Sequence, residues 1–145
     1  MATASDVLRA KRSGTVITVA AESSVTDACR LLREKNIGAL LVLEGERLVG
    51  IFTERDVVKR VVAEGLDPAA TPVARVMTPK VIVVRPDRTV EEIEAILKQE
   101  RVRHVPVVGD QGLAGIISIG DLTAWHADED HQRVEYLTEY LYGRA

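Results

Sequence analysis

Two short segments of the chain pair a hydroxyl side chain with a carboxylate three residues later. They are Thr53-Glu54-Arg55-Asp56 and Ser118-Ile119-Gly120-Asp121, and each follows a glycine and two apolar residues. Such a pair can hold a polar ligand, because carboxylates accept hydrogen bonds and the N–H groups at a helix start attract anions. The same spacing is a capping box that needs no ligand, and spacing alone favours capping. The preceding glycine-apolar-apolar context and its duplication favour a binding role, which capping does not exclude.

The other reactive side chains do not suggest catalysis or a metal site. The sequence contains no nucleophile–base pair, no glycine-rich phosphate loop and no cluster of metal ligands, so we expect no enzyme activity and no obligatory cofactor. His126 and His131 are five positions apart and would lie on different faces of a helix, which argues against metal binding. Cys29 is the single cysteine, so no internal disulfide is possible, and its apolar neighbours predict a buried, unreactive thiol.

Composition and charge argue against several functional classes. The 145 residues are 46% hydrophobic and 28% charged, as in a globular protein, and the formal net charge of −3 gives no basic field for nucleic acid. No apolar run approaches the roughly 20 residues that a membrane helix needs, and the N-terminus lacks the apolar stretch of a secretory signal. We therefore expect a cytoplasmic protein with no membrane or nucleic-acid partner.

The two hydroxyl–carboxylate segments belong to a repeat that organises the chain. At an offset of 65 residues, Val16–Val62 aligns with Val81–Ala127 without a gap, and ten positions are identical. Each copy predicts the order β-α-β-β-α, with a β-branched strand, a helix after a capping box, an apolar hairpin and a final helix. The predicted strands are Thr15–Val19, Ala39–Leu43 and Leu48–Phe52 in the first copy, and Val81–Val84, Val105–Val108 and Leu113–Ile117 in the second. The predicted helices begin after Ser24 and Thr89, and near Asp56 and Asp121.

Neither copy is large enough to be stable by itself, because a three-stranded sheet with helices on one face leaves its other face apolar. We therefore predict an α/β (α+β) fold in which the two sheets pack face to face about a pseudo-two-fold axis, with an equivalent cleft at each end of that axis. The predicted parts of this one module are a leading segment 1–14 with a short helix over Ser5–Lys11, repeat one at 15–63, a linker at 64–79, repeat two at 80–127 and a C-terminal helix at 128–145.

Aromatic residues are concentrated at the C-terminal end of the chain. Trp125, Tyr136, Tyr140 and Tyr142 lie there, and apolar residues in the same stretch recur at helical spacing. So many rings outside the repeats predict a helix that docks on its own module or on a partner copy.

Four segments of the sequence resemble the cystathionine-β-synthase (CBS) domain family. They are Val76-Met77-Thr78-Pro79, Arg103-His104-Val105-Pro106-Val107-Val108, Gly50-Ile51-Phe52-Thr53-Glu54-Arg55-Asp56 and Gly115-Ile116-Ile117-Ser118-Ile119-Gly120-Asp121. The whole chain resembles small stand-alone prokaryotic proteins made of a tandem CBS pair, or Bateman module. The resemblance implies that adenosine-containing ligands bind between the repeats. In that pattern the Asp holds the ribose hydroxyls, which suits a carboxylate because it can accept two hydrogen bonds from a vicinal diol, and the Thr or Ser contacts ribose or phosphate.

The resemblance also assigns residues to each cleft, with adenine against the first strand and the start of the second strand of the opposite repeat. One cleft would combine Ile17, Ile37, Gly38 and Ala39 with Arg103, Ser118 and Asp121, and the other Ile82, Val102 and His104 with Thr53, Arg55 and Asp56. The first copy has Gly38-Ala39-Leu40-Leu41 where the second has Arg103-His104-Val105-Pro106, so it lacks a cation there. We therefore expect two unequal clefts.

These observations predict a non-catalytic regulatory module that senses AMP, ADP, ATP or NAD(H), forms a homodimer and acts on an unidentified downstream protein. The sequence does not choose among these ligands. The alternative is an interaction scaffold with vestigial clefts that acts through its C-terminal helix.

Overall fold

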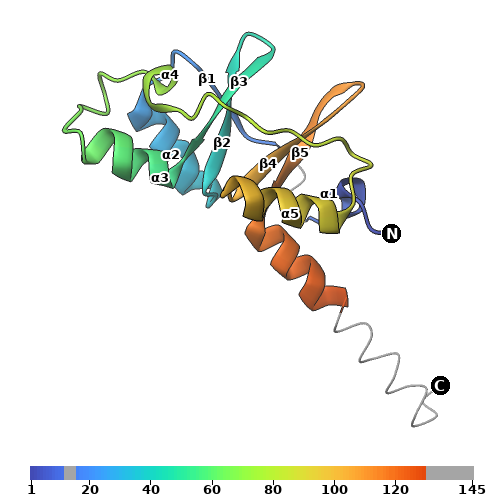
Figure 1. Cartoon of the computed structure of the whole chain (residues 1–145). Helices are drawn as coiled ribbons and strands as arrows, with labels where there is room; N and C mark the ends of the chain where they lie inside the picture. Colours follow the sequence, from blue (N-terminus) through green and yellow to red (C-terminus); the bar gives the residue numbers. More distant parts are fainter. Residues whose placement is uncertain (12–15, 130–145) are drawn as a thin grey trace, which may run out of the picture. The chain divides into compact units, whose positions relative to one another are not determined.

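The computed structural model describes residues 1–11 and 16–129, and the chain is drawn in Figure 1. It divides into two compact units. Unit 1 is formed by Met1–Gly14 together with Val83–Ala145, and unit 2 is formed by Thr15–Ile82. Helices and strands alternate in both units, which confirms the predicted mixed class.

Unit 2 is a three-stranded sheet with helices. The sheet order is β1 (Thr18–Ala20), β2 (Ala39–Glu44) and β3 (Arg47–Thr53), in which β1 is parallel to β2 and β2 is antiparallel to β3. Phe52 and Leu40 are fully buried in its core, and each buried side chain of this size contributes about 2–3 kcal/mol. The elements are β1 (Thr18–Ala20), α2 (Val25–Lys35), β2 (Ala39–Glu44), β3 (Arg47–Thr53), α3 (Glu54–Asp56), the π-helical η1 (Val57–Val62) and α4 (Val73–Val76).

Unit 1 contains a β-hairpin, a leading helix and a long helix with its own buried face. Ile93, Val105 and Ile117 are fully buried in its core. The elements are α1 (Ala4–Ala10), α5 (Val90–Glu100), β4 (His104–Gly109) and β5 (Gly112–Ser118). A further helix covers residues 119–129. The predicted short helix over Ser5–Lys11 is confirmed as α1, whereas most of the predicted C-terminal helix, from residue 130 onward, lies outside the described residues.

The helices α2 and α5 begin and end in the same way because the repeat carries the same signals. Ser24 accepts a hydrogen bond from the Asp27 N–H at 3.1 Å, and Thr89 accepts one from the Glu92 N–H at 3.2 Å. Each helix ends at a residue in the left-handed conformation, Asn36 at φ 53° and Arg101 at φ 55°. These two positions are equivalent in the repeat, so the caps confirm the duplication at the level of the backbone.

The two hairpins also match in register. Ala39 pairs with Thr53 in unit 2, and the equivalent His104 pairs with Ser118 in unit 1. Both ladders contain an irregularity at the same place, between Val42 and Leu43 and between Val107 and Val108. Since a bulge re-aims the strand beyond it, the two hairpins present their Thr53 and Ser118 ends in the same local geometry.

The first predicted strand of the second copy is not formed. Only Val84 of Val81–Val84 makes a parallel bridge, donating to the Pro106 carbonyl at 3.0 Å and accepting from the Val108 N–H at 2.9 Å. In unit 2 the Leu41 N–H extends the equivalent ladder to the Ile17 carbonyl. Pro106 occupies the position of Leu41 and has no N–H, so this ladder bond cannot be made in the second copy.

Each unit is completed by a leading helix that docks through backbone hydrogen bonds. In unit 2, Val73 N–H donates to Ser23 O at 2.8 Å, and in unit 1, Ala4 N–H donates to Arg88 O at the same distance. Arg88 is the repeat equivalent of Ser23, so α4 and α1 are structural counterparts. They differ in length, because α1 has 7 residues and α4 has 4.

A glycine lies under each leading helix. A Cβ atom on Gly115 would lie 2.6 Å from a Leu8 methyl group, and one on Gly50 would lie 3.0 Å from the Thr78 carbonyl and closer still to the Met77 sulfur. Both contacts are tighter than a side chain allows. Gly50 therefore allows the close approach of a backbone segment to β3, whereas Gly115 allows the close approach of the flexible Leu8 side chain to β5.

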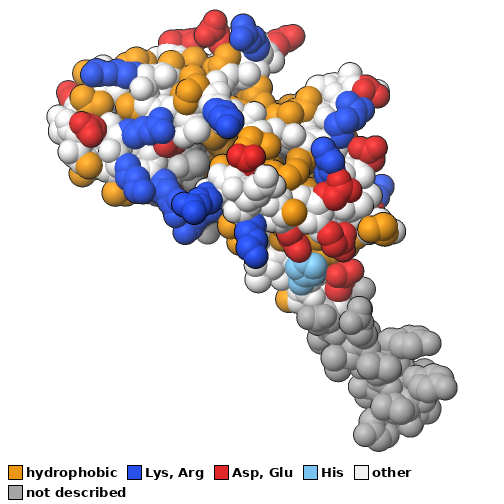
Figure 2. All heavy atoms as spheres, viewed as in Figure 1, with side chains coloured by type: hydrophobic (Ala, Val, Ile, Leu, Met, Phe, Trp, Pro, Cys, Tyr) orange, Lys and Arg blue, Asp and Glu red, His pale blue; other side chains and the backbone are white. Residues whose placement is uncertain are grey.

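Charged side chains of both signs are interspersed with apolar ones on the visible face of the chain (Figure 2). Among the exposed apolar side chains are Val58 and Val62 of η1, at 61% and 70% exposure. Within residues 1–11 and 16–129, no helix combines the length and the apolar character needed to cross a bilayer.

Candidate functional site

In unit 2 the predicted hydroxyl–carboxylate pair forms a reciprocal capping box at the end of β3. Asp56 Oδ2 accepts hydrogen bonds from the Thr53 N–H at 3.0 Å and from Thr53 Oγ1 at 3.3 Å. In return, the Asp56 N–H donates to Thr53 Oγ1 at 3.3 Å. The pair is thus a capping box, as the spacing predicts, and the cap fixes the carboxylate at the start of a helix.

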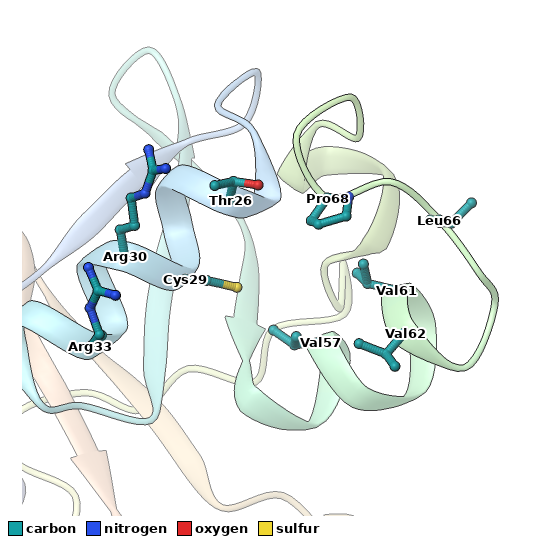
Figure 3. Close-up of a pocket in the computed structure, with 9 residues that line it drawn as sticks. All are labelled: Thr26, Cys29, Arg30, Arg33, Val57, Val61, Val62, Leu66 and Pro68. Carbon is teal, nitrogen blue, oxygen red and sulfur yellow. The ribbon is translucent and has the colours of Figure 1, made fainter.

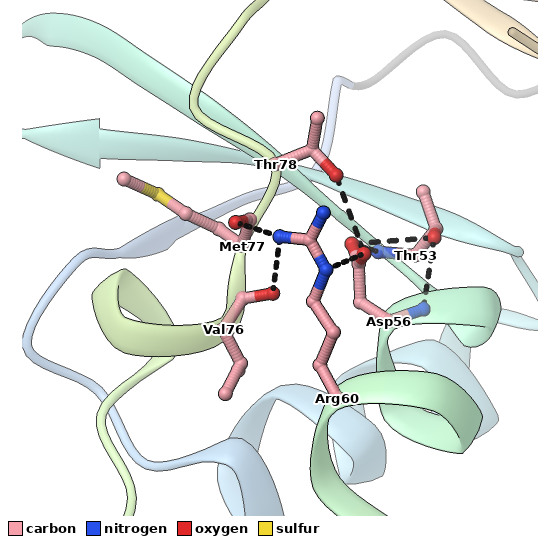
Figure 4. A network of polar contacts seen from close by, with 6 residues as sticks. All are labelled: Thr53, Asp56, Arg60, Val76, Met77 and Thr78. Carbon is pink, nitrogen blue, oxygen red and sulfur yellow. Dashed lines mark hydrogen bonds and ion pairs between the residues drawn. The ribbon is translucent and has the colours of Figure 1, made fainter.

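Two further side chains close around Asp56 (Figure 4). Thr78 donates its hydroxyl to Asp56 Oδ1 at 3.2 Å, and Arg60 Nε lies 3.6 Å from the same oxygen. Arg60 also donates through Nη1 to the Met77 carbonyl at 2.8 Å. Thr78 is held in place by paired backbone hydrogen bonds with Ile51. Both oxygens of the Asp56 carboxylate are therefore engaged within unit 2, and the side chain is only 7% exposed.

In unit 1 the equivalent pair has the same cap but different neighbours. Asp121 Oδ2 accepts from the Ser118 N–H at 2.8 Å, and the Asp121 N–H donates to Ser118 Oγ at 3.0 Å. Lys11 Nζ lies 2.9 Å from the same Oδ2 and donates to the Ile116 carbonyl at 2.6 Å. The Asp121 side chain is 22% exposed, and its Oδ1 makes no hydrogen bond to any residue that the structure describes. This carboxylate is the more accessible of the two.

The other predicted ligand residues of the first copy lie near Thr53. Ala39 is its strand partner, and the Gly38 carbonyl accepts from the Glu54 N–H at 3.1 Å. Ile17 and Ile37 are half-buried against the core of unit 2. The structure therefore brings the start of β2 together with the Thr53 cap of the same repeat, and Arg55 is exposed beside it.

The second copy repeats this arrangement. His104 is the strand partner of Ser118, and the Arg103 carbonyl accepts from the Ile119 N–H at 2.9 Å. Val102 is half-buried against the core of unit 1, and the Arg103 side chain is exposed. Ile82 lies at the end of unit 2 and is half-buried. The predicted pairing of each set with the cap of the opposite repeat stays a prediction.

Three residues around the carboxylates were not predicted as site residues. Arg60 lies one helical turn after Asp56, and this spacing was a signal for an ion pair. Thr78 lies in the Val-Met-Thr-Pro segment, which resembles the CBS family, but the resemblance assigns no role to Thr78. Lys11 lies 105 residues before Ile116, which it contacts, and outside the gapless repeat. Nothing in the sequence links it to Asp121.

A pocket of about 450 Å³ lies elsewhere in unit 2, between α2 and η1 (Figure 3). None of its lining residues is a predicted ligand residue. Cys29, which the sequence predicts to be buried, is half-buried in the wall of this pocket, and partial burial raises the pKa of its thiol. The lining residues are Thr26, Cys29, Arg30, Arg33, Val57, Val61, Val62, Leu66 and Pro68.

His126 takes part in an ion pair rather than in a cluster of metal ligands. Its Nε2 contacts Glu94 Oε1 on α5, and its Nδ1 lies 3.6 Å from Glu129 Oε2. The hydrogen bond to Glu94 raises the pKa of His126, and the nearby charges of Glu94 and Glu129 act in the same direction. Among the described residues no group of three His, Cys, Asp or Glu side chains is placed to hold a metal ion, and His131 lies outside them.

Comparison with known proteins relates both copies to one family. The model of the CBS domain matches twice, at residues 4–63 and 73–128. Hypoxic response protein 1 of Mycobacterium tuberculosis is 31% identical over 138 residues, which cover 94% of this chain and 92% of that protein. A solved structure of Hypoxic Response Protein I with two coordinated zinc ions is 30% identical with a TM-score of 0.71, over 86% of this chain and 98% of that one.

Two further solved structures resemble the chain more closely in three dimensions. A protein of Burkholderia ambifaria described as a signal-transduction protein with CBS domains is 42% identical, with a TM-score of 0.80 over 83% of this chain and 90% of that one. A hexameric CBS-CP12 protein from bloom-forming cyanobacteria is 33% identical, with a TM-score of 0.75 over 85% of this chain and 70% of that one. Each match of the family model begins with a leading helix, α1 or α4, that completes the unit built on the other match.

Proposed function

Because this chain belongs to the CBS domain family, with two copies of the domain, we propose that it is a regulatory module without catalytic activity that binds an adenosine-containing nucleotide. Asp121 and Ser118 provide the principal contacts to ribose and phosphate, and Asp56 and Thr53 provide the second set. The ligand is AMP, ADP, ATP or NAD(H), and adenine lies against the strand starts of the opposite repeat, in the two clefts assigned by the family resemblance.

One observation carries this proposal. The Gly-apolar-apolar-(Thr/Ser)-x-x-Asp segment occurs twice, and in both copies the capping box holds the carboxylate at a helix start beside the end of a strand. A carboxylate fixed in this way can accept hydrogen bonds from both hydroxyls of a vicinal diol. The helix start beside it offers N–H groups to a phosphate. The exposed Arg103, at the start of the second copy's hairpin, adds a cation close to Ser118.

Isothermal titration calorimetry with AMP, ADP, ATP and NAD tests the proposal. We expect binding of at least one nucleotide, and we expect Asp121→Asn to weaken it by roughly tenfold or more, since a charged hydrogen-bond acceptor for ribose is lost. Asp110→Asn is the matched control, because Asp110 is an exposed aspartate of the same unit. No binding of any of the four nucleotides at millimolar concentration would reject the proposal.

We further propose that the protein works as a homodimer. The exposed Val58 and Val62 beside the apolar pocket of unit 2 support association, because exposed clustered apolar side chains favour burial against a partner. The similar cyanobacterial CBS-CP12 protein is hexameric, which also supports association. Size-exclusion chromatography with light scattering tests this proposal, and a monomer at micromolar concentration would reject it.

The second candidate function is an interaction scaffold that acts through the C-terminal segment. The observation in its favour is the sequence itself, in which Tyr136, Tyr140 and Tyr142 follow the second repeat. Truncation after Ala127 distinguishes the two functions. If the protein is a scaffold that acts through this segment, truncation abolishes its assembly and leaves any nucleotide binding unchanged. Assembly that survives the truncation would count against the scaffold.

A further inference from the structure

Among the residues that the structure describes, Lys11 is the one cation that touches the accessible carboxylate of unit 1. Its Nζ lies 2.9 Å from Asp121 Oδ2 and 2.6 Å from the Ile116 carbonyl oxygen, and its side chain is only 19% exposed. An ammonium group has three N–H donors. Two are used by these contacts, and no residue that the structure describes accepts the third. The third donor is therefore available to a ligand that binds next to Asp121.

The position of Lys11 follows from the greater length of α1. In unit 2, Met77 lies over Gly50 and the next residue, Thr78, reaches the carboxylate of Asp56 with its hydroxyl. In unit 1, Leu8 lies over Gly115 in the same way, but α1 continues to Ala10 and Lys11 follows it. A neutral hydroxyl in one unit is thus replaced by an ammonium group in the other.

The cation of unit 2 cannot serve the same purpose. Arg60 donates to the carbonyl oxygen of Met77 at 2.8 Å, and it is 3.6 Å from an Asp56 carboxylate that is 7% exposed. Its repeat equivalent in unit 1 is Trp125, so the position that holds Arg60 in unit 2 carries no charge in unit 1. Lys11 therefore gives Asp121 a cationic partner that comes from the leading segment, at the more open of the two carboxylates.

We propose that Lys11 makes the Asp121 site selective for ligands that carry a phosphate group over uncharged nucleosides. This inference rests on the proposed function. A ribose that approaches Asp121 competes with Lys11 for the carboxylate oxygens. A phosphate on the same ligand gives the Lys11 ammonium a second anionic partner and accepts a hydrogen bond from its third N–H. An uncharged nucleoside offers the ammonium no anion. Its binding therefore weakens the Lys11–Asp121 ion pair and gives Lys11 no new anionic partner.

Calorimetric titration with AMP and with adenosine tests this selectivity. Lys11→Met keeps the aliphatic stem and removes the charge. We expect it to weaken AMP binding by roughly three- to tenfold, as for a partly exposed charged contact, while adenosine binds as well as before or better. The ratio of AMP affinity to adenosine affinity then falls by about fivefold or more. Lys11→Arg keeps the charge and should retain most of the ratio.

Two controls separate this inference from the proposed function. Lys98→Met removes an exposed lysine of α5 with no ion pair among the described residues, and it should leave both affinities unchanged. In an Asp121→Asn background, Lys11→Met should have a smaller effect on the ratio, because the two residues act on one site. Circular dichroism of each variant confirms that it is folded.

The outcomes are distinct. An unchanged ratio in a folded Lys11→Met variant that binds AMP overturns the role of Lys11 and leaves the proposed function intact. Failure of the wild type and of every variant to bind either compound overturns both. A lower ratio in Lys98→Met of the same size as in Lys11→Met also overturns the inference, since the effect would then be one of net charge.

Discussion

The Asp56 and Asp121 sites have the same local sequence and the same cap, yet they differ in what surrounds the carboxylate. Asp56 is enclosed by Thr78 and Arg60 from its own unit and is 7% exposed. Asp121 is 22% exposed, and within the described part of the chain Lys11 is the one side chain that it meets beyond its cap. A duplicated motif therefore specifies where a carboxylate lies but not how much of it a ligand can reach. In unit 2 the carboxylate holds the linker against the sheet, and in unit 1 it remains accessible.

The largest expected effect comes from removing each carboxylate. Asp56→Ala leaves the Thr53 N–H, the Thr78 hydroxyl and the Arg60 guanidinium without their shared acceptor. We expect it to lower the free energy of unfolding by about 3 kcal/mol, because breaking a buried charged network leaves its partners unpaired. Asp121→Ala, at the more open site, should cost about 1 kcal/mol. Urea denaturation followed by circular dichroism measures both values.

Equal losses for these two variants would contradict the comparison. The matched control is Asp67→Ala in the linker of unit 2, where the exposed side chain accepts one local hydrogen bond from the Ala69 N–H at 3.0 Å. It should lower the unfolding free energy by less than about 1 kcal/mol.

A smaller difference is expected at the two glycines beneath the leading helices. A methyl group on Gly50 meets the Thr78 carbonyl, which is backbone and cannot rotate away, as well as the Met77 side chain. A methyl group on Gly115 meets only the Leu8 side chain, which can change rotamer. We expect Gly50→Ala to cost about 2–3 kcal/mol and Gly115→Ala about 1 kcal/mol. Thermal unfolding of both variants gives their order, and the reverse order would show that α1 is packed more rigidly than α4.

Removing the charge of Arg60 in unit 2 should have a modest effect on the free energy of unfolding. Arg60→Met removes the hydrogen bond to the Met77 carbonyl and the long ion pair with Asp56. The Arg60 side chain is half exposed, so we expect a loss of about 1 kcal/mol in unfolding free energy. Lys59→Met, at the preceding exposed position, is the control and should change stability by less than about 0.5 kcal/mol. A loss of unfolding free energy that is larger for Lys59→Met than for Arg60→Met would show that the contacts of Arg60 do not stabilise the Asp56 site.

The smallest effect concerns a position that the two repeats use differently. Val61 is buried in unit 2, whereas its equivalent His126 is exposed in unit 1 and pairs with Glu94. The pKa of His126 is raised above its ordinary value of 6.5 by that hydrogen bond. The pair therefore stabilises the folded state below pH 6.5, and this contribution is lost as the pH rises through the raised pKa.

Glu94→Gln tests this pair. The variant should return the pKa of His126 toward its ordinary value. An NMR titration of the imidazole C–H signals measures this pKa, and His126→Gln assigns the signals. It should be less stable than the wild type below pH 6.5 and equal to it at a pH above the raised pKa. A stability difference that does not change with pH would show that the contact is not an ion pair.

Much of the fold could be predicted from the sequence because the signals are local and occur twice. Ser24 and Thr89 predict the starts of α2 and α5, and the apolar runs predict both hairpins. The prediction of a strand over Val81–Val84 was wrong, because a β-branched run does not indicate which residue will lie opposite it in the sheet. That partner, Pro106, lacks the N–H that the equivalent Leu41 uses. A prediction from strand propensity alone has no access to that difference.

The candidate sites could be predicted in part. The two hydroxyl–carboxylate pairs were found from spacing and duplication, and the structure places each at a helix start as expected. The contact between Lys11 and Asp121 could not be predicted, because it joins parts of the chain that are distant in sequence and outside the aligned repeat. Such a contact depends on where a whole helix docks, and residue spacing carries no information about that.

The docking of α1 also has a consequence for how the protein is made. Unit 2 is one continuous segment, Thr15–Ile82, so it can fold as soon as that segment has left the ribosome. Unit 1 needs α1 together with β5, which comes last among the strands that the structure describes. Domains fold as their residues emerge during synthesis. Helix α1 is therefore synthesised before unit 2 but cannot dock in unit 1 until β5 has followed it.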